Sequence, residues 1–213
     1  MQHSPLTSRR AAIYQWFSQL LFQELSEAQL AALGSQESRS WITSLSAIPG
    51  LASDVKRFER SLTRVLQRAA RAQELAADFA SLFLLAPPVG VSPYAGHYPH
   101  TTPAQERRQM NALLVEQALA PRENEASDHI AIQLALMAEQ VSREAPVATQ
   151  YYFLQHHVLC WAPLFMASCQ QRDAKGFYVL AVVMMVHFIR EDAQYLQSLL
   201  LTSSPTFALR DLG

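Results

Sequence analysis

The sequence predicts an all-α protein, a helical bundle of about nine to ten helices. Apolar residues recur at helical spacing in almost every segment, and no segment shows the strand alternation and hairpin turns of a sheet. Glycine is scarce, at 6 of 213 residues, which favours helix. Half of the residues are hydrophobic and only 16% are charged, so the chain can bury a substantial core.

Five helices are predicted before residue 86. They run from Thr7 or Ser8 to about Leu25, from Glu27 to Leu33, from Glu37 to Ala47, from Ser53 or Asp54 through Ala69, and from Gln73 to Leu85. Ser26 is a favourable N-cap and Gly34 a favourable stop for the second helix. The segment Ser8-Arg9-Arg10 is similar to the start of a twin-arginine export signal. Polar residues such as Gln15 and Gln19 interrupt the apolar stretch that such a signal needs, so we expect a first helix that stays in the mature protein.

A long loop is predicted from Ala86 to Pro103. This segment contains five prolines and two glycines, which exclude a continuous helix. A loop of this length in a compact protein is often functional. Its aromatic residues Tyr94, His97, Tyr98 and His100 favour an ordered path, because aromatic rings need packing partners.

The remaining helices follow this loop. They run from Ala104 to about Leu119, from Ser127 or Asp128 as the cap to about Arg143, from Pro146 to about Gln171 with a bend at Pro163, and from Asp173 as the cap to about Leu201. The tail from Thr202 is expected to be irregular.

The charged linker after Pro121 divides the chain. We predict an N-terminal helical part over residues 1–120, a hinge linker over 121–127 and a C-terminal helical part over 128–213. The C-terminal helices are so apolar that we expect them to pack on the N-terminal ones. If the linker straightened, they would dock on a second copy, which would give a homodimer by domain swap.

Charge and composition exclude several classes of protein. The net charge of −1 provides no global field to attract nucleic acid. Two cysteines form no disulfide framework, which favours a reducing cytoplasm. The most apolar run, 177–189, is too short to cross a bilayer, so we expect no membrane insertion.

Asp128 and His129 are the first candidates for chemistry. Adjacent positions on a helix point about 100° apart, so they do not form a ready acid–base pair. A helix cap explains Asp128, and we expect its charge to face a partner.

The sequence gives little support for a metal site or a catalytic site. His156, His157, Cys160 and Cys169 lack the paired spacing of a zinc site, and the cysteines are better interpreted as small buried residues. No common catalytic or phosphate-binding motif is present. We therefore predict no metal site and no catalytic residues, while an enzyme that uses scattered residues stays an alternative at this point.

The spacing of five arginines predicts a basic stripe on one helix face. It consists of Arg57, Arg60, Arg64, Arg68 and Arg71, spaced i, i+3, i+7, i+11 and i+14. A solvated face is the favoured interpretation. Nucleic-acid binding and an acidic partner surface are the alternatives.

Three motifs in order resemble the TorD family of molybdoenzyme chaperones. Glu125-Ala126-Ser127-Asp128-His129 resembles the family's E-P-x-D-H. Tyr94-Ala95-Gly96-His97-Tyr98 is similar to its Y-x-S-x-Y loop, and Trp161-Ala162-Pro163-Leu164-Phe165 to its W-x-P-x-F segment. Two residues depart from the pattern. Ala126 replaces a proline, which loosens the hinge, and Gly96 replaces a serine, which removes a hydroxyl that could contact a partner.

The resemblance implies a cytoplasmic binding protein and not an enzyme. Members of the family bind the twin-arginine leader and the apo form of a molybdoenzyme, here trimethylamine N-oxide reductase. They assist insertion of the molybdopterin cofactor and delay export. A leader-binding groove needs an acidic mouth and an aromatic floor, which predicts a site at Asp128, His129, Glu125, Tyr94, Tyr98 and Trp161. The resemblance implies no required cofactor, with weak GTP binding left open. A GTP-hydrolysing helical protein and an oligomeric scaffold are the alternative functions.

Overall fold

A computed structural model describes residues 4–120 and 125–203. Its helices are α1 (Pro5–Phe22), α2 (Glu27–Gly34), α3 (Gln36–Ser44), α4 (Ala52–Leu66), α5 (Arg71–Phe79), α6 (Pro103–Glu116), α7 (Ile130–Ser142), α8 (Val147–Phe153), α9 (Ala162–Arg172) and α10 (Phe177–Ser203). Short 3₁₀ turns, η1 (Leu45–Ala47) and η3 (Ala95–His97), and π turns, η2 (Ala80–Leu84) and η4 (Leu154–Val158), complete the elements. The prediction of an all-α protein with nine or ten helices is confirmed over these residues.

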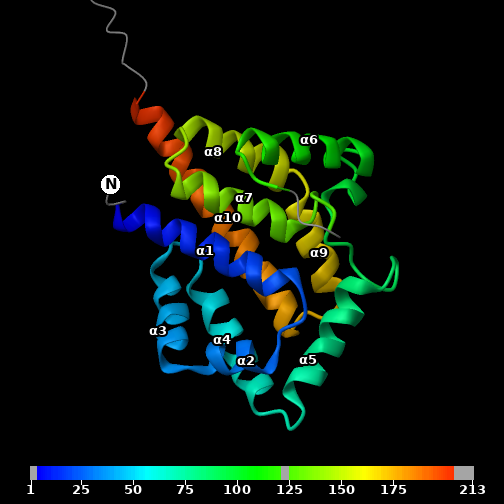
Figure 1. Cartoon of the computed structure of the whole chain (residues 1–213). Helices are drawn as coiled ribbons and strands as arrows, with labels where there is room; N and C mark the ends of the chain where they lie inside the picture. Colours follow the sequence, from blue (N-terminus) through cyan, green and yellow to red (C-terminus); the bar gives the residue numbers. More distant parts are fainter. Residues whose placement is uncertain (1–3, 121–124, 204–213) are drawn as a thin grey trace, which may run out of the picture.

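Helix α10 crosses the middle of the molecule (Figure 1). It contacts α4, α8 and α9 as well as α1, and α1 packs along α7. Helices α2 to α5 lie on one side of this centre, and α6 and α8 lie on the other. The central position of α10 explains its apolar sequence, because nearly every residue from 177 to 189 is buried. None of the described helices has the length and apolar character needed to cross a membrane.

One hydrophobic core draws on both predicted parts of the chain. Its buried members include Phe17 of α1, Phe58 of α4, Met137 of α7 and Met184 of α10. The expectation that the C-terminal helices pack on the N-terminal ones is confirmed. The hinge over 121–127 and the domain swap stay predictions, and residues 121–124 lie outside the described part of the chain.

The second helix begins as the sequence predicts and ends one residue later than predicted, with Gly34 inside the helix. Ser26 forms a capping box in which Gln29 N donates to Ser26 Oγ at 3.3 Å and Ser26 N donates to Gln29 Oε1 at 2.9 Å. The predicted cap of the first helix is wrong. Ser4 caps it, and Pro5 takes the first helical position, where a proline loses no hydrogen bond.

Two predictions in the C-terminal part are also wrong. The helix expected over 146–171 is two helices, α8 and α9, separated by η4 and a turn at residues 159–161. Pro163 is the second residue of α9, so it marks a start and not a bend. The last helix begins at Phe177, because the Asp173 carboxylate accepts from Lys175 N at 3.0 Å and closes a turn instead of capping the helix.

A buried ion pair joins three helices of the core. Asp192 of α10 accepts from Arg10 Nε at 2.6 Å, from another Arg10 nitrogen at 2.9 Å and from Tyr14 OH at 2.8 Å. Arg10 also donates to Gln150 Oε1 of α8 at 3.0 Å. Every charge in this network is compensated, which a carboxylate and a guanidinium removed from water require.

Replacing Asp192 by alanine should destabilise the protein by about 3–5 kcal/mol, because the buried Arg10 guanidinium loses its partner. Urea unfolding followed by circular dichroism measures the change. Glu139→Ala is the control, since Glu139 pairs with Arg143 on the surface and its loss should cost about 1 kcal/mol or less. Equal losses in the two variants would contradict this role of Asp192.

Candidate functional site

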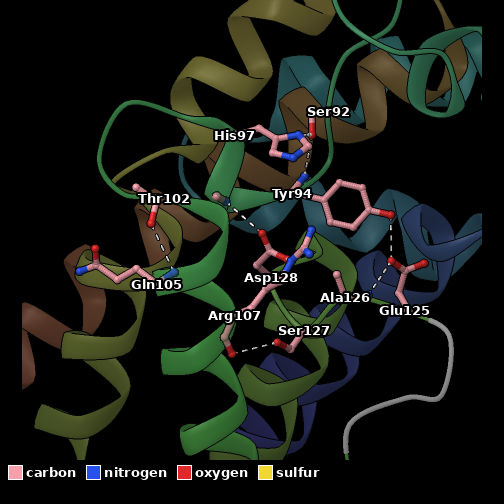
Figure 2. Close-up of polar contacts among 11 residues, drawn as sticks. Ser92, Tyr94, His97, Thr102, Gln105, Arg107, Glu125, Ala126, Ser127 and Asp128 are labelled. Atoms are coloured by element: carbon pink, nitrogen blue, oxygen red, sulfur yellow. Dashed lines mark hydrogen bonds and ion pairs between the residues drawn. The ribbon is translucent and has the colours of Figure 1, made fainter.

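The long loop packs against the segment that precedes α7, and Figure 2 shows the side chains at this junction. Tyr94 and His129 form an isolated antiparallel bridge. Ala95 N donates to Asp128 O at 3.0 Å, and Ile130 N donates to Pro93 O at 2.9 Å. The structure thus brings the first two predicted motifs together through their backbones.

Asp128 is fully buried beneath the loop. Its Oδ2 accepts from Gly96 N at 3.1 Å, and its Oδ1 lies 3.1 Å from Arg107 Nε of α6 (Figure 2). The prediction that Asp128 caps the helix and exposes its charge is wrong. Helix α7 begins two residues later, at Ile130, which leaves the carboxylate free to hold the loop.

His129 is the cap of α7. Its Nδ1 accepts from Ala131 N at 3.1 Å, so a ring nitrogen replaces the oxygen of a usual cap. Burial lowers the pKa of His129 to about 4, and the nearby carboxylates of Glu125 and Asp128 oppose that change only in part. The ring is therefore neutral at pH 7. Asp128 and His129 bind backbone groups of different segments, which agrees with the expectation that they are not an acid–base pair.

Tyr94 and Glu125 form the more accessible part of the junction. Both are half-buried, and Tyr94 OH donates to Glu125 Oε1 at 2.8 Å. The Tyr94 and His129 rings meet edge to face with their centroids 5.1 Å apart. Burial and the bond to Glu125 raise the pKa of Tyr94 to about 12.

Tyr98 and Trp161 lie together deeper in the structure. Their ring centroids are 5.1 Å apart, and Tyr98 OH donates to Ser92 O at 2.8 Å. Trp161 is fully buried, and its Nε1 donates to Gln133 Oε1 at 3.1 Å and to His157 O at 3.0 Å. The prediction that Trp161 forms the floor of an open groove is wrong, because its side chain is fully buried. Trp161 is a core residue that supports the loop through Tyr98.

The sequence analysis missed one residue at the junction and misinterpreted another. Arg107 pairs with Asp128 while 46% of its side chain is exposed. Nothing in its helical surroundings distinguishes it from Arg108. Gly96 approaches its neighbours closely, since a Cβ there would lie 2.4 Å from Pro103 Cα and 2.9 Å from Asp128 Oδ2. The glycine therefore provides space, and the missing serine hydroxyl is not its main effect.

No group of His, Cys, Asp and Glu residues that could hold a metal ion occurs in the described ranges. Cys169 is buried, as expected, and Cys160 is half-buried, with its sulfur donating to His156 O at 3.1 Å. The weak GTP binding left open above remains a prediction.

The fold and the junction define an all-helical protein in which a buried carboxylate holds a long loop and α6 against the segment before α7. Residues 48–167 match the family model described as nitrate reductase delta subunit. Chaperone protein TorD of Salmonella bongori is 88% identical over 94% of this chain and 96% of that protein. Chaperone protein TorD of Vibrio cholerae serotype O1 is 36% identical over 92% and 95%, and that of Photobacterium profundum 34% identical over 88% and 94%.

The chain therefore belongs to the TorD family of molybdoenzyme maturation chaperones. The predictions of this family, of a chaperone function and of a protein that is not an enzyme are confirmed.

The buried His129 should make the stability depend on pH. Its folded pKa of about 4 lies below the ordinary value of 6.5, so the unfolded chain takes up the proton first as the pH falls. The stability present above pH 6.5 should decline towards pH 4 by on the order of 3 kcal/mol. His129→Asn keeps a capping acceptor that does not titrate, and its stability should fall less steeply over this range. Urea unfolding at several pH values measures both stabilities. If the stability of the wild type and that of His129→Asn fall equally with pH, His129 is not the cause of the decline.

Gly96→Ala should destabilise the protein by about 1–3 kcal/mol, because the added methyl group meets backbone atoms of Pro103. Thermal unfolding measures the effect. Gly34→Ala is the matched control, since its Cβ would meet the end of the Leu66 side chain, which can move. A Gly96→Ala variant as stable as the control would show that the loop has room.

Proposed function

We propose that this chain is a cytoplasmic chaperone that binds the twin-arginine leader and the apo form of trimethylamine N-oxide reductase. It would aid insertion of the molybdopterin cofactor and delay export until insertion is complete. The family, and relatives named Chaperone protein TorD, support this proposal. The leader site would be the surface over the loop junction.

The pairing of Asp128 with Arg107 is the observation that carries the leader site. A fully buried carboxylate has as its ionic partner an arginine whose side chain is 46% exposed. This geometry already accommodates a guanidinium, which is the group that a twin-arginine leader presents. In the free chaperone, Arg107 would occupy the position that a leader arginine takes in the complex.

The neighbouring groups suit the same ligand. Glu125 is half-buried beside Tyr94, and its Oε1 accepts from Tyr94 OH at 2.8 Å and from Ala126 N at 2.9 Å. Its second carboxylate oxygen could accept from the other leader arginine, and the Tyr94 ring offers an apolar face. His129, Tyr98 and Trp161 would act indirectly, by holding the loop in place.

Isothermal calorimetry with a synthetic leader peptide tests this site. Asp128→Asn keeps an oxygen for Gly96 N–H and removes the charge, so leader affinity should fall about tenfold or more. Arg107→Gln removes an internal competitor, so leader affinity should rise. Arg108→Ala, in the exposed position next to Arg107, is the control and should leave affinity within about twofold.

Two outcomes would contradict the proposed leader site. Unchanged affinity in Asp128→Asn would remove the buried carboxylate from the site. Weaker binding in Arg107→Gln would show that Arg107 contacts the leader and does not compete with it. Circular dichroism of each variant establishes that the helices are intact.

A further inference from the structure

The prediction that the five arginines share one helix face is wrong, because α4 ends at Leu66, Arg68 follows it and Arg71 begins α5. Arg68 pairs with Asp78 at 2.7 Å, and Arg71 pairs with Glu27, so these two arginines are neutralised on the surface. The other three arginines line a groove of about 530 Å³. Its lining residues are Arg57, Arg60, Arg64, Ala174, Lys175 and Leu180, from α4, the turn before α10 and α10 itself.

The positive charge of this groove is poorly compensated. Arg57 is 3.9 Å from Asp54, and that carboxylate also lies 2.6 Å from His187 Nδ1. Arg60 and Arg64 are exposed, and Arg64 donates to the Lys175 carbonyl at 3.4 Å. Among residues 4–120 and 125–203, no carboxylate forms an ion pair with Arg60, Arg64 or Lys175. A chain with a net charge of −1 therefore carries a local cluster of positive charge.

The groove favours an acidic peptide segment over a phosphate ligand. Its guanidinium and ammonium groups bind carboxylates, and the arginine stems and Leu180 give it apolar walls. The carbonyl oxygens of Ala174 and Lys175 accept from Arg57 and Arg64 at 3.4 Å, and each keeps a second lone pair for another donor. A peptide supplies both carboxylates for the cations and N–H donors for carbonyl oxygens, whereas a phosphate supplies acceptors only.

We propose that this groove, between α4 and the start of α10, docks an acidic segment of the client's apo catalytic body. The inference rests on the proposed chaperone function. It adds a second binding site, which is positively charged, whereas the proposed leader site binds through carboxylates. Helix α4 lies in the lower half of Figure 1, and α6, which carries Arg107, lies in the upper half. A basic leader is repelled from the groove, so leader and body bind at different places.

The test uses the double variant R60E/R64E and the control R39E/R108E, which changes net charge equally at exposed arginines outside the groove. The probe is apo trimethylamine N-oxide reductase lacking its leader. R60E/R64E should weaken its binding about tenfold or more and flatten the dependence of affinity on salt. The control should bind as the wild type does, and leader-peptide affinity should stay within about twofold in R60E/R64E. Equal affinity of R60E/R64E and the control for the leaderless enzyme would overturn the proposal.

A second probe separates this inference from the proposed function. It is a synthetic amphipathic peptide rich in glutamate and leucine, measured by fluorescence anisotropy. If the wild type binds this peptide and R60E/R64E does not, the acidic-segment site stands, even if the leaderless enzyme fails to bind and the proposed client is wrong. If the wild type binds neither probe, the groove is not a docking site.

Discussion

The burial of the Asp128 carboxylate is the interaction on which the arrangement of the junction depends. A carboxylate removed from water requires donors, and here they are the Gly96 N–H and the Arg107 guanidinium. These two bonds attach the loop and α6 to the segment before α7. Backbone hydrogen bonds on either side of Asp128 extend the same contact. The half-exposed Tyr94 and Glu125 lie beside this attachment and are joined by a hydrogen bond of their own.

Local patterns in the sequence were sufficient for much of the fold. The apolar spacing of Val55, Phe58 and Leu62 correctly predicts the buried face of α4, and Ser26 correctly predicts a helix start. Both features depend on neighbours within one or two turns, which the sequence displays directly. The position of Pro163 was misjudged because the same residue type suits a bend or the first turn of a helix.

The detailed chemistry of the junction could not be predicted in this way. The partners of Asp128 lie 32 and 21 residues away in sequence, so its local preference for a helix start is overridden by distant contacts. His129 then takes the capping position, for which imidazole is an uncommon choice. Arg107 has no local signal, since only the fold reveals that α6 passes the buried carboxylate. The family resemblance indicated which segments form the junction, but only the structure shows what each side chain contacts there.

A net charge near zero concealed a local cluster of positive charge in the α4 groove. At the junction, by contrast, the buried Asp128 carboxylate is paired with Arg107, and the half-buried Glu125 accepts from Tyr94 OH. Overall charge excludes long-range attraction to a polyanion, but it does not describe the charge of a single surface.

The packing of α1 and α10 also shows how much of the chain is needed to form the core. The matched family segment, residues 48–167, contains the loop junction but neither of these two helices. Both lie at the centre of the core, where α1 covers α7 and α10 covers α4, α8 and α9. A polypeptide cut to the matched segment would expose those apolar faces to water and would be prone to aggregate. The boundaries by which the family is recognised are thus narrower than the boundaries of the unit that folds.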